Sequence, residues 1–339
     1  MILDGASPQA IAQAVQVLQR GELVGLPTET VYGLAADAGN PAAVAQIFAT
    51  KGRPSNHPLI VHVASAEAVS VFAAEVPAFA QRLTRAFWPG PLTLILPRRP
   101  EVGAAAAGGQ DSVGLRCPAH PVALALLQAC AAQGIHGLAA PSANLFGRVS
   151  PTTAAHVQSE LGRDLLVLDG GACEVGIESS IIDCTRGVPV LLRPGQITRA
   201  QIEAACGLKV LNPDALQAPA PRASGTLESH YAPRAKVRLM SAPEIGAKLQ
   251  ALGPHANNVG IWSAQRPDAA PVGGAEGASG MGAGVLWRAQ PSDAAQAAQA
   301  LFSVLRDLDA RGVMQIWVQQ PPDTPEWDGV RDRLQRAAA

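Results

Sequence analysis

The sequence predicts an α/β protein of two domains, the first built on a mixed sheet. The chain has 339 residues, 48% of them hydrophobic, and at roughly 100–200 residues per domain this length suggests two domains. Short apolar runs alternate with helical patterns, and in places two apolar runs follow each other directly, which indicates strands of both directions in one sheet. A chain this apolar can also bury enough surface to offset its conformational entropy, so disorder is excluded.

The first elements show the alternation clearly. Ser7 and Pro8 are typical of an N-cap and a first helical position, and Gly21 suits the end of a helix whose apolar face is formed by Ile11, Ala14, Val15 and Leu18. An apolar run at 23–26 then predicts a strand that stops at Pro27. A polar loop over 27–33 follows it.

The same alternation of apolar runs and helical patterns predicts the remaining helices and strands of the first domain. Helices are expected near 40–50 and 66–87 and at 119–132, 152–161 and 198–206. Strands are expected at 59–63, 92–96, 112–116, 136–140, 165–168, 179–184 and 188–193.

The composition changes from Asn212 to Arg234, where Pro, Ala, Ser and Gly replace bulky apolar residues. This is typical of a linker that cannot pack as an element, so we place the boundary here, with domains at 1–207 and 236–339 and a linker at 208–235. The second domain is expected to be a smaller α/β unit with strands at 237–240, 259–262, 284–286 and 314–318 and helices at 243–251, 292–311 and 326–336. A Gly/Ala/Ser-rich stretch at 272–284 predicts a flexible loop within it.

Charge and cysteine usage exclude several classes of protein. The 26 Lys and Arg residues balance 27 Asp and Glu residues, which argues against a general nucleic-acid coat protein and leaves room only for a local basic site. The five cysteines are an odd number without a C-x-x-C pair, so a disulfide framework and a structural zinc site are both disfavoured. We expect them to be small buried hydrophobes in a reducing compartment.

The apolar runs also indicate in which cellular compartment the protein is expected. The longest fall far short of the roughly 20 residues needed to span a bilayer, so no transmembrane helix is expected. The N-terminus lacks a basic start followed by an apolar stretch, which disfavours a secretory signal. We therefore expect a cytoplasmic protein without membrane contact.

Polar residues gather where predicted strands end, the edge at which open α/β sheets bind ligands. The loop P-T-E-T-V-Y-G-L (27–34) carries hydroxyls and a carboxylate, and K-G-R-P-S-N-H-P (51–58) carries two cations suited to phosphate. Taken alone, the first loop is explained equally well as a local turn, and Lys51 and Arg53 are explained better as a solvated basic loop. His62 lies inside an apolar strand, where a satisfied core histidine is the commoner outcome.

Four further clusters follow along the chain. Arg116 ends S-V-G-L-R-C-P and is a candidate carboxylate clamp. Ser142, Asn144 and Ser150 follow a strand and suit phosphate and ribose oxygens, although turn formation explains their spacing about equally well. The last two clusters are E-S-S at 178–180 and L-R-P-G at 192–195. No H-E-x-x-H, P-loop or G-x-S-x-G motif occurs, and no nucleophile has an obvious paired base, so the clusters indicate phosphate-centred chemistry.

The order of these motifs resembles the YrdC-like threonylcarbamoyl-adenylate synthases in their longer form. The succession is P-T-E-T-V-Y-G-L, K-G-R-P-x-x-x-P-L-I-V-H, S-V-G-L-R-C-P, P-S-A-N, E-S-S-I-I-D and L-R-P-G, followed by H-Y-A-P in the linker. The resemblance covers about residues 8–207 and 224–233. It implies a twisted mixed sheet with helices and a Rossmann-like C-terminal domain, although 236–339 resembles that domain only in position and size.

The resemblance implies an enzyme that joins L-threonine, bicarbonate or CO2, and ATP into threonylcarbamoyl-AMP and releases pyrophosphate. Mg²⁺ would accompany the phosphates, with no protein metal site predicted. The product would pass to a tRNA threonylcarbamoyl transferase that modifies an adenosine next to the anticodon. Whether the chain itself binds tRNA is left open.

The resemblance also assigns residues to substrates, position by position. Threonine would be held by Thr30, His62, Arg116 and Ser179. The nucleotide would be held by Lys51, Arg53, His57, Ser112, Ala140, Ser142, Asn144, Ser150, Arg193 and Tyr231, with Lys51 and Arg53 as the catalytic cations. His57 stands where the family usually has Asn, and Ser224-Gly225 where it often has Pro-Gly. Tyr231 would make the linker a lid over the nucleotide.

Two other functions are weighed against this one. An RNA-binding module without catalysis would use the same basic loops, but the balanced charge and the 13 aromatic residues (6 Phe, 5 Trp and 2 Tyr) disfavour it. A carbamoyltransferase for hydrogenase maturation contains a similar domain, but that reading expects zinc-finger cysteines and an acylphosphatase segment, which this sequence lacks.

Overall fold

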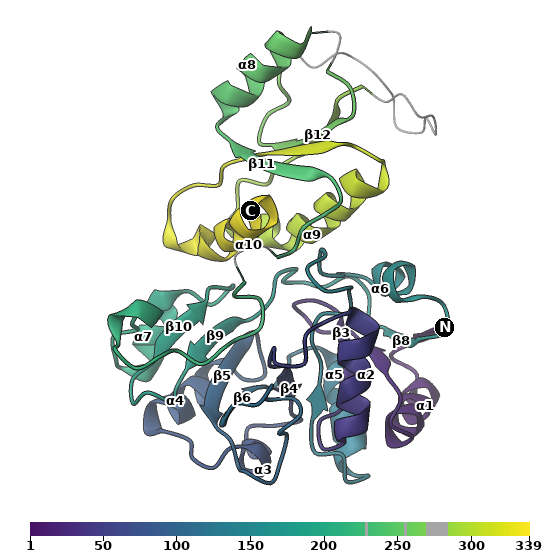
Figure 1. The fold of residues 1–339 in the computed structure, drawn as a ribbon, viewed down its shortest axis with the longest axis vertical. Helices are drawn as coiled ribbons and strands as arrows, with labels where there is room; N and C mark the ends of the chain where they lie inside the picture. Colours follow the sequence, from purple (N-terminus) through teal and green to yellow (C-terminus); the bar gives the residue numbers. More distant parts are fainter. Residues whose placement is uncertain (228–229, 254–255, 269–283) are drawn as a thin grey trace. The chain divides into compact units, whose positions relative to one another are not determined.

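The computed structural model describes residues 1–227, 230–253, 256–268 and 284–339. They form two compact units. The first unit contains residues 1–146 and 150–226, and the second contains 147–149 and 227–339 (Figure 1).

The first unit is built on one ten-stranded mixed sheet, as predicted. In spatial order its strands are β1 (Ile2–Asp4), β8 (Leu166–Asp169), β2 (Val24–Leu26), β3 (Gly33–Asp37), β7 (Leu138–Ala139), β4 (Ile60–His62), β6 (Ser112–Arg116), β5 (Leu92–Pro97), β9 (Ser180–Asp183) and β10 (Val190–Arg193). The pairs β1–β8, β8–β2, β4–β6 and β5–β9 are parallel. The other neighbouring pairs are antiparallel.

Seven helices are described in the first unit: α1 (Pro8–Gln19), α2 (Pro41–Lys51), α3 (Val69–Phe72), α4 (Ala78–Phe87), α5 (Pro121–Ala131), α6 (Ala154–Leu161) and α7 (Arg199–Cys206). The predicted start of α1 is confirmed, since the Ser7 hydroxyl accepts the Ala10 N–H and Pro8 occupies the first turn. Asn40 caps α2 in the same way, and Gly52 ends it in the left-handed region at φ 61°. This turn fixes the direction in which the chain leaves Lys51.

Three sequence expectations need correction. The strands β1 and β3 were not predicted, because each is short and β3 (G-L-A-A-D) lacks the β-branched and aromatic residues that signal a strand. Part of the segment expected not to pack does pack: Leu211 pairs with Val190 of β10, and residues 222–224 lie on the sheet. This segment is held against the first unit by hydrogen bonds to its backbone N–H and carbonyl groups rather than by apolar side chains.

The second unit contains a four-stranded parallel sheet in the order β11 (Lys236–Met240), β14 (Gln315–Gln319), β12 (Val259–Ser263) and β13 (Leu286–Ala289). Figure 1 shows α8 (Ala242–Leu252) on one side of this sheet and α9 (Ala294–Ala310) and α10 (Asp328–Ala338) on the other. A short 3-10 turn, Pro325–Trp327, precedes α10. Apart from Gly284, the loop expected at 272–284 lies outside the described residues.

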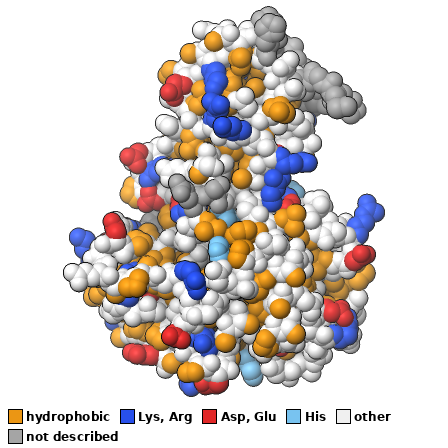
Figure 2. Space-filling model, in the orientation of Figure 1, with side chains coloured by type: hydrophobic (Ala, Val, Ile, Leu, Met, Phe, Trp, Pro, Cys, Tyr) orange, Lys and Arg blue, Asp and Glu red, His pale blue; other side chains and the backbone are white. Residues whose placement is uncertain are grey.

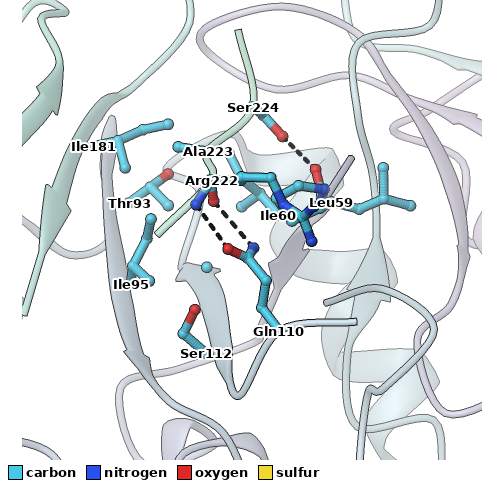
Figure 3. Close-up of a pocket in the computed structure, with 12 residues that line it drawn as sticks. Leu59, Ile60, Thr93, Ile95, Gln110, Ser112, Ile181, Arg222, Ala223 and Ser224 are labelled. Atoms are coloured by element: carbon cyan, nitrogen blue, oxygen red, sulfur yellow. Dashed lines mark hydrogen bonds between the residues drawn. The ribbon is translucent and has the colours of Figure 1, made fainter. Parts of the chain in front are cut away.

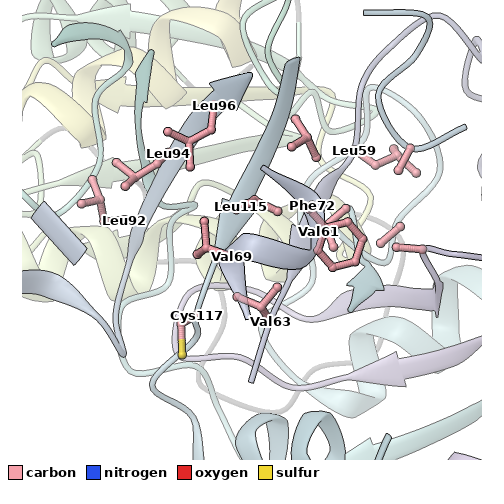
Figure 4. Packing of buried hydrophobic residues seen from close by; sticks show 14 of the residues in the cluster. Leu59, Val61, Val63, Val69, Phe72, Leu92, Leu94, Leu96, Leu115 and Cys117 are labelled. Carbon is pink, nitrogen blue, oxygen red and sulfur yellow. The ribbon is translucent and has the colours of Figure 1, made fainter. Parts of the chain in front are cut away.

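The two faces of the central strands differ in chemistry. Because side chains alternate along a strand, Leu92, Leu94, Leu96, Val61 and Leu115 fall on one face, where they join the main hydrophobic core (Figure 4). The opposite face is called the site face here. It carries Ile60 and His62 of β4, Ser112, Gly114 and Arg116 of β6, Thr93 and Ile95 of β5, Ile181 of β9 and Arg193 of β10.

All five cysteines are buried free thiols, as expected. Among the helices of the described residues, none has the length and apolar character needed to cross a bilayer.

Candidate functional site

One row across the site face collects the polar strand residues. His62 pairs with Arg116 across β4 and β6, and Ile181 pairs with both Thr93 and Arg193. Continuing the antiparallel register of β5 and β6 by one pair places Thr93 beside Arg116. Strand pairing therefore brings together residues that are up to 131 positions apart in the sequence.

Arg116, 4% exposed, is held on three sides. Its Nη1 donates to the Thr30 hydroxyl at 2.7 Å and its Nε donates to the Gly90 carbonyl at 3.2 Å. Its Nη2 lies 2.6 Å from the carboxylate Oε1 of Glu29, whose side chain is 7% exposed. The candidate clamp for a carboxylate is thus already one half of a buried ion pair.

A side-chain turn presents Glu29 and Thr30 to this arginine. Pro27 follows β2, and the Thr28 hydroxyl accepts the N–H groups of Thr30 and Val31 at 3.2 Å each. The same hydroxyl donates to the Val31 carbonyl at 2.6 Å. These local bonds fix the backbone of the turn, and the Thr28 and Thr30 hydroxyls also lie 2.9 Å apart, which holds the Thr30 side chain beside Arg116.

His62 is a buried, neutral imidazole. Burial lowers its pKa to about 3, and the adjacent Arg116 charge lowers it further in the same direction. A neutral ring can donate or accept hydrogen bonds beside the Arg116 guanidinium without adding a second positive charge.

Ser179 links the row to Arg193. Its hydroxyl lies 2.7 Å from the Thr93 hydroxyl and 3.2 Å from Arg193 Nη2, and its carbonyl accepts from Arg193 Nε at 3.1 Å. Arg193 Nη1 also donates to the Ser224 carbonyl at 2.8 Å. The predicted threonine residue Ser179 and the predicted nucleotide residue Arg193 are therefore in direct contact.

Lys51 holds the loop that follows β7. Its Nζ donates to the carbonyls of Ser142 at 2.6 Å and Asn144 at 2.5 Å, and the side chain is 2% exposed. Burial lowers the Lys51 pKa to about 7, and the nearby Arg53 charge acts in the same direction. The loop bearing Ser142 and Asn144 is thus tied to the end of α2.

Arg53 and His57 share one aromatic neighbour. The Arg53 guanidinium lies 5.6 Å from the ring centre of Phe146, and the His57 ring meets Phe146 edge-on at 5.4 Å. Arg53 also donates to the Pro58 carbonyl at 2.9 Å and to the Ser224 hydroxyl at 3.4 Å. Burial, followed by the charge of Arg53, lowers the pKa of His57.

The remaining nucleotide candidates of the first unit lie at three places. Ala140 is buried beside Gly33 and donates its N–H to the Ile60 carbonyl. Ser150 is fully buried and donates to the carboxylate of Glu178 at 2.5 Å. Ser112 begins β6, about 13 Å along the strand from Arg116 at roughly 3.3 Å per residue.

Residues 222–224 cover the site face near Ser112 (Figure 3). The Gln110 side chain accepts the Arg222 N–H at 2.7 Å and donates to its carbonyl at 3.2 Å, and the Ser224 hydroxyl donates to the Pro58 carbonyl at 2.7 Å. The cavity left beneath is about 10 Å³, roughly the space of one water. Ile60, Ile95 and Ile181 give it an apolar floor.

Tyr231 belongs to the second unit. It is 1% exposed, its ring lies 5.4 Å from that of Phe302, and the Arg333 guanidinium lies 5.5 Å from its ring centre. Its φ of 63° is rare for an aromatic residue. Its predicted contact with a nucleotide stays a prediction.

Sequence reasoning missed several residues of this site. Glu29 was quoted within its motif, but only Thr30 was assigned a role. Thr93, a single hydroxyl in the apolar run L-T-L-I-L, was the available signal for a polar position in β5. Glu178 opens the E-S-S cluster, but only Ser179 of that cluster is assigned a role, and Gln110 gives no signal because its partner Arg222 is 112 residues away in the chain.

On the face drawn in Figure 2, basic and acidic side chains are dispersed among uncharged atoms. Over the described residues, no group of three or more His, Cys, Asp or Glu side chains is placed to hold a metal ion.

Two family profiles together match nearly the whole chain. A family described as "Telomere recombination" matches residues 16–195, and one described as "Threonylcarbamoyl-AMP synthase, C-terminal domain" matches residues 197–339. The second match confirms an α/β C-terminal domain of the kind that the resemblance implied.

Full-length relatives carry a consistent name. The chain is 39% identical to the threonylcarbamoyl-AMP synthase of Bacillus subtilis over 333 residues, covering 97% of this chain and 92% of that one. It is 36% identical to the threonylcarbamoyl-AMP synthase of Pyrococcus abyssi, covering 96% of this chain and 93% of that one. A crystal structure of P. abyssi Sua5 complexed with L-threonine matches with a TM-score of 0.85 and 34% identity, over 100% of this chain and 97% of that one. The motif order, the mixed sheet and these full-length matches lead to one conclusion: the chain belongs to the threonylcarbamoyl-AMP synthase family, in the form that carries the additional C-terminal domain.

Proposed function

We propose that the protein is an L-threonylcarbamoyladenylate synthase, a nucleotidyltransferase that converts L-threonine, bicarbonate or CO2, and ATP into threonylcarbamoyl-AMP and pyrophosphate. The observation that carries the proposal is the contact of the two predicted residue sets, since Ser179 bonds Arg193 directly on a chain that belongs to this family. Relatives named for this activity and a relative solved with L-threonine support it.

In this proposal the Arg116 end of the row takes the amino acid. Thr30, His62 and Ser179 flank Arg116 or Thr93 there, and the arginine would bind the α-carboxylate. Charge-assisted bonds inside a buried site are stronger and more directional than in water. Threonine would thereby be held with its amine close to the next reacting group.

The nucleotide would occupy the neighbouring cations. Arg53 and Arg193 both contact Ser224, and Arg53 lies close enough to Lys51 to lower its pKa, so three basic side chains converge on one region. Such a group neutralises a polyphosphate and the charge that develops as pyrophosphate leaves. Mg²⁺ would enter with ATP as part of the substrate.

The chemistry proposed here needs orientation more than a dedicated base. The neutral threonine amine adds to CO2 and loses a proton to solvent, which gives a carbamate. A carbamate oxygen then bonds to the α-phosphorus of ATP as the bond to the bridging oxygen breaks, and pyrophosphate leaves with that oxygen. Holding two anions in line while neutralising their charge is a large share of such catalysis. We further propose that the product is passed to a tRNA threonylcarbamoyl transferase in the cytoplasm, as the first step of adenosine modification beside the anticodon.

The test is incubation with ATP, Mg²⁺, L-threonine and bicarbonate, with threonylcarbamoyl-AMP detected by mass spectrometry and pyrophosphate measured in parallel. We expect equal amounts of both products and neither when threonine is omitted. Binding of tRNA without pyrophosphate release would instead favour the RNA-binding alternative.

A further inference from the structure

Glu29 is the feature of the site that the proposed mechanism leaves unused. Its carboxylate is 7% exposed and lies 2.6 Å from Arg116 Nη2. Among the described residues, neither of its oxygens has a partner in hydrogen-bond geometry. Removing a buried carboxylate from water is costly unless its lone pairs are satisfied, so a position like this one calls for a functional explanation.

The geometry of the turn directs this carboxylate to the arginine. The neighbouring Thr30 hydroxyl binds the same guanidinium at 2.7 Å, while the Thr28 hydroxyl fixes the backbone between them. The backbone carbonyl of Glu29 is separately engaged by the Val175 N–H at 2.7 Å. The main chain of Glu29 is therefore anchored, and its buried carboxylate is the acidic group that faces Arg116.

A carboxylate and a guanidinium at this spacing match a particular ligand chemistry. An α-amino acid at neutral pH carries an ammonium and a carboxylate on one carbon, a few ångströms apart. Arg116 alone would attract any carboxylate, whereas the pair of Arg116 and Glu29 is nearly neutral and offers one complementary charge to each end of a zwitterion. A buried pair of this kind disfavours a ligand that has only one of the two charges.

We propose that Glu29 binds the α-ammonium of the amino-acid substrate while Arg116 binds its α-carboxylate. This assignment rests on the proposed function, because it takes the substrate to be an α-amino acid. It adds a residue to the binding set and gives the site a means of rejecting hydroxy acids and other simple carboxylates. Glu29 is then a specificity-determining residue rather than only a support for Arg116.

The experiment measures binding by titration calorimetry, with no ATP present, for three ligands. L-Threonine carries both charges, 2,3-dihydroxybutanoate lacks the ammonium, and L-threoninamide lacks the carboxylate. For the wild type we expect L-threonine to bind at least tenfold more tightly than 2,3-dihydroxybutanoate. This comparison needs no variant and therefore does not depend on how well a variant folds.

The variant Glu29→Gln keeps the shape of the side chain and removes its charge. We expect it to weaken the binding of L-threonine and L-threoninamide at least tenfold and to leave the binding of 2,3-dihydroxybutanoate as tight as in the wild type or tighter, because the Arg116 charge is then no longer neutralised. The matched control is Glu22→Gln, which removes the same charge from an exposed ion pair with Arg20 and should change none of the three. Thermal unfolding of each variant verifies that it is folded.

Two outcomes would overturn the assignment. If Glu29→Gln weakens the binding of all three ligands to the same degree, the role of Glu29 is to orient Arg116 and not to bind the ammonium. If the wild type binds 2,3-dihydroxybutanoate as tightly as L-threonine, no group in the site recognises the ammonium. Failure of the proposed function would look different, since the wild type would then bind neither L-threonine nor L-threoninamide.

Discussion

Two groups of buried cations in the first unit are partnered in different ways. Arg116 lies against the carboxylate of Glu29, so its charge is largely neutralised within the fold. The hydrogen bonds of Lys51, Arg53 and Arg193 include those to the carbonyls of Ser142, Asn144, Pro58, Ser179 and Ser224 and to two serine hydroxyls, and Glu160 supplies an acidic charge that acts on Lys51. A neutralised pair suits a zwitterion, and a cluster of like charges suits a polyphosphate. The ligand expected at each place therefore depends on the partner of the cation as well as on the cation.

The largest effect is expected at Arg116. Arg116→Ala removes the proposed carboxylate contact and leaves Glu29 as a buried charge without its partner, and each loss of this kind costs about 2–5 kcal/mol. The KM for threonine should rise by roughly thirtyfold or more, since 1.4 kcal/mol is about tenfold. The KM for ATP, measured in the same assay, should change less. An unchanged threonine KM would remove Arg116 from the amino-acid site.

The acid stability of the fold should depend on His62. Its pKa of about 3 in the folded protein lies below the ordinary value of 6.5, so between these values the unfolded chain binds a proton that the folded chain does not. The contribution is fully present above pH 6.5 and is lost as the pH falls toward 3. At pH 4 this loss is on the order of 3 kcal/mol.

Urea unfolding at a series of pH values tests this expectation. The free energy of unfolding should fall less steeply below pH 6.5 in His62→Gln than in the wild type. His136→Gln, at an exposed position, is the matched control and should keep the wild-type slope. Parallel slopes for the wild type and His62→Gln would contradict a neutral buried imidazole beside Arg116.

Arg53→Gln tests the other group of cations. Removing a charge-assisted contact to a phosphate costs about 1.5–3 kcal/mol, so ATP affinity should fall roughly tenfold or more. Threonine affinity, measured without ATP, should change less than twofold. The exposed Arg20→Gln serves as the control for the loss of one positive charge. If Arg53→Gln weakens threonine binding as much as ATP binding, the two groups of cations are not each specific for one substrate.

The smallest effect is expected at Gly114, which lies on the site face between the two ends. An alanine methyl there would lie 3.5 Å from the Thr93 methyl and 3.6 Å from Ile60, which is ordinary packing distance. The free energy of unfolding of Gly114→Ala should stay within about 0.5 kcal/mol of wild type. ATP affinity should fall a fewfold, because the added methyl takes up space on the site face next to the nucleotide candidate Ser112. Threonine affinity should not change. Equal losses of ATP affinity and threonine affinity would mean that the part of the site face around Gly114 contributes to the binding of both ligands.

Local signals in the sequence were enough to predict the class of fold and to nominate candidate site residues. Apolar runs, caps and turn residues are local signals, so most elements of the first unit, from α1 with its Ser7 cap to β10, lie within a few residues of their predicted places. The motif order alone brought Thr30, Lys51, Arg116 and Arg193 to attention. The short strands β1 and β3 escaped prediction because their pairing, rather than their composition, makes them strands.

The partners of the site residues are visible only in the folded structure. Glu29 meets Arg116 across 87 positions of sequence, Thr93 meets Ser179 across 86, and Lys51 reaches the carbonyls of Ser142 and Asn144 across 91 and 93. No local pattern encodes such contacts, because they depend on the order and register in which distant strands join the sheet. The register also places one set of alternating side chains in the core and the other on the site face. The chemical type of a residue limits which ligands it can bind, and the contacts it makes in the folded protein determine which of those ligands it can still bind.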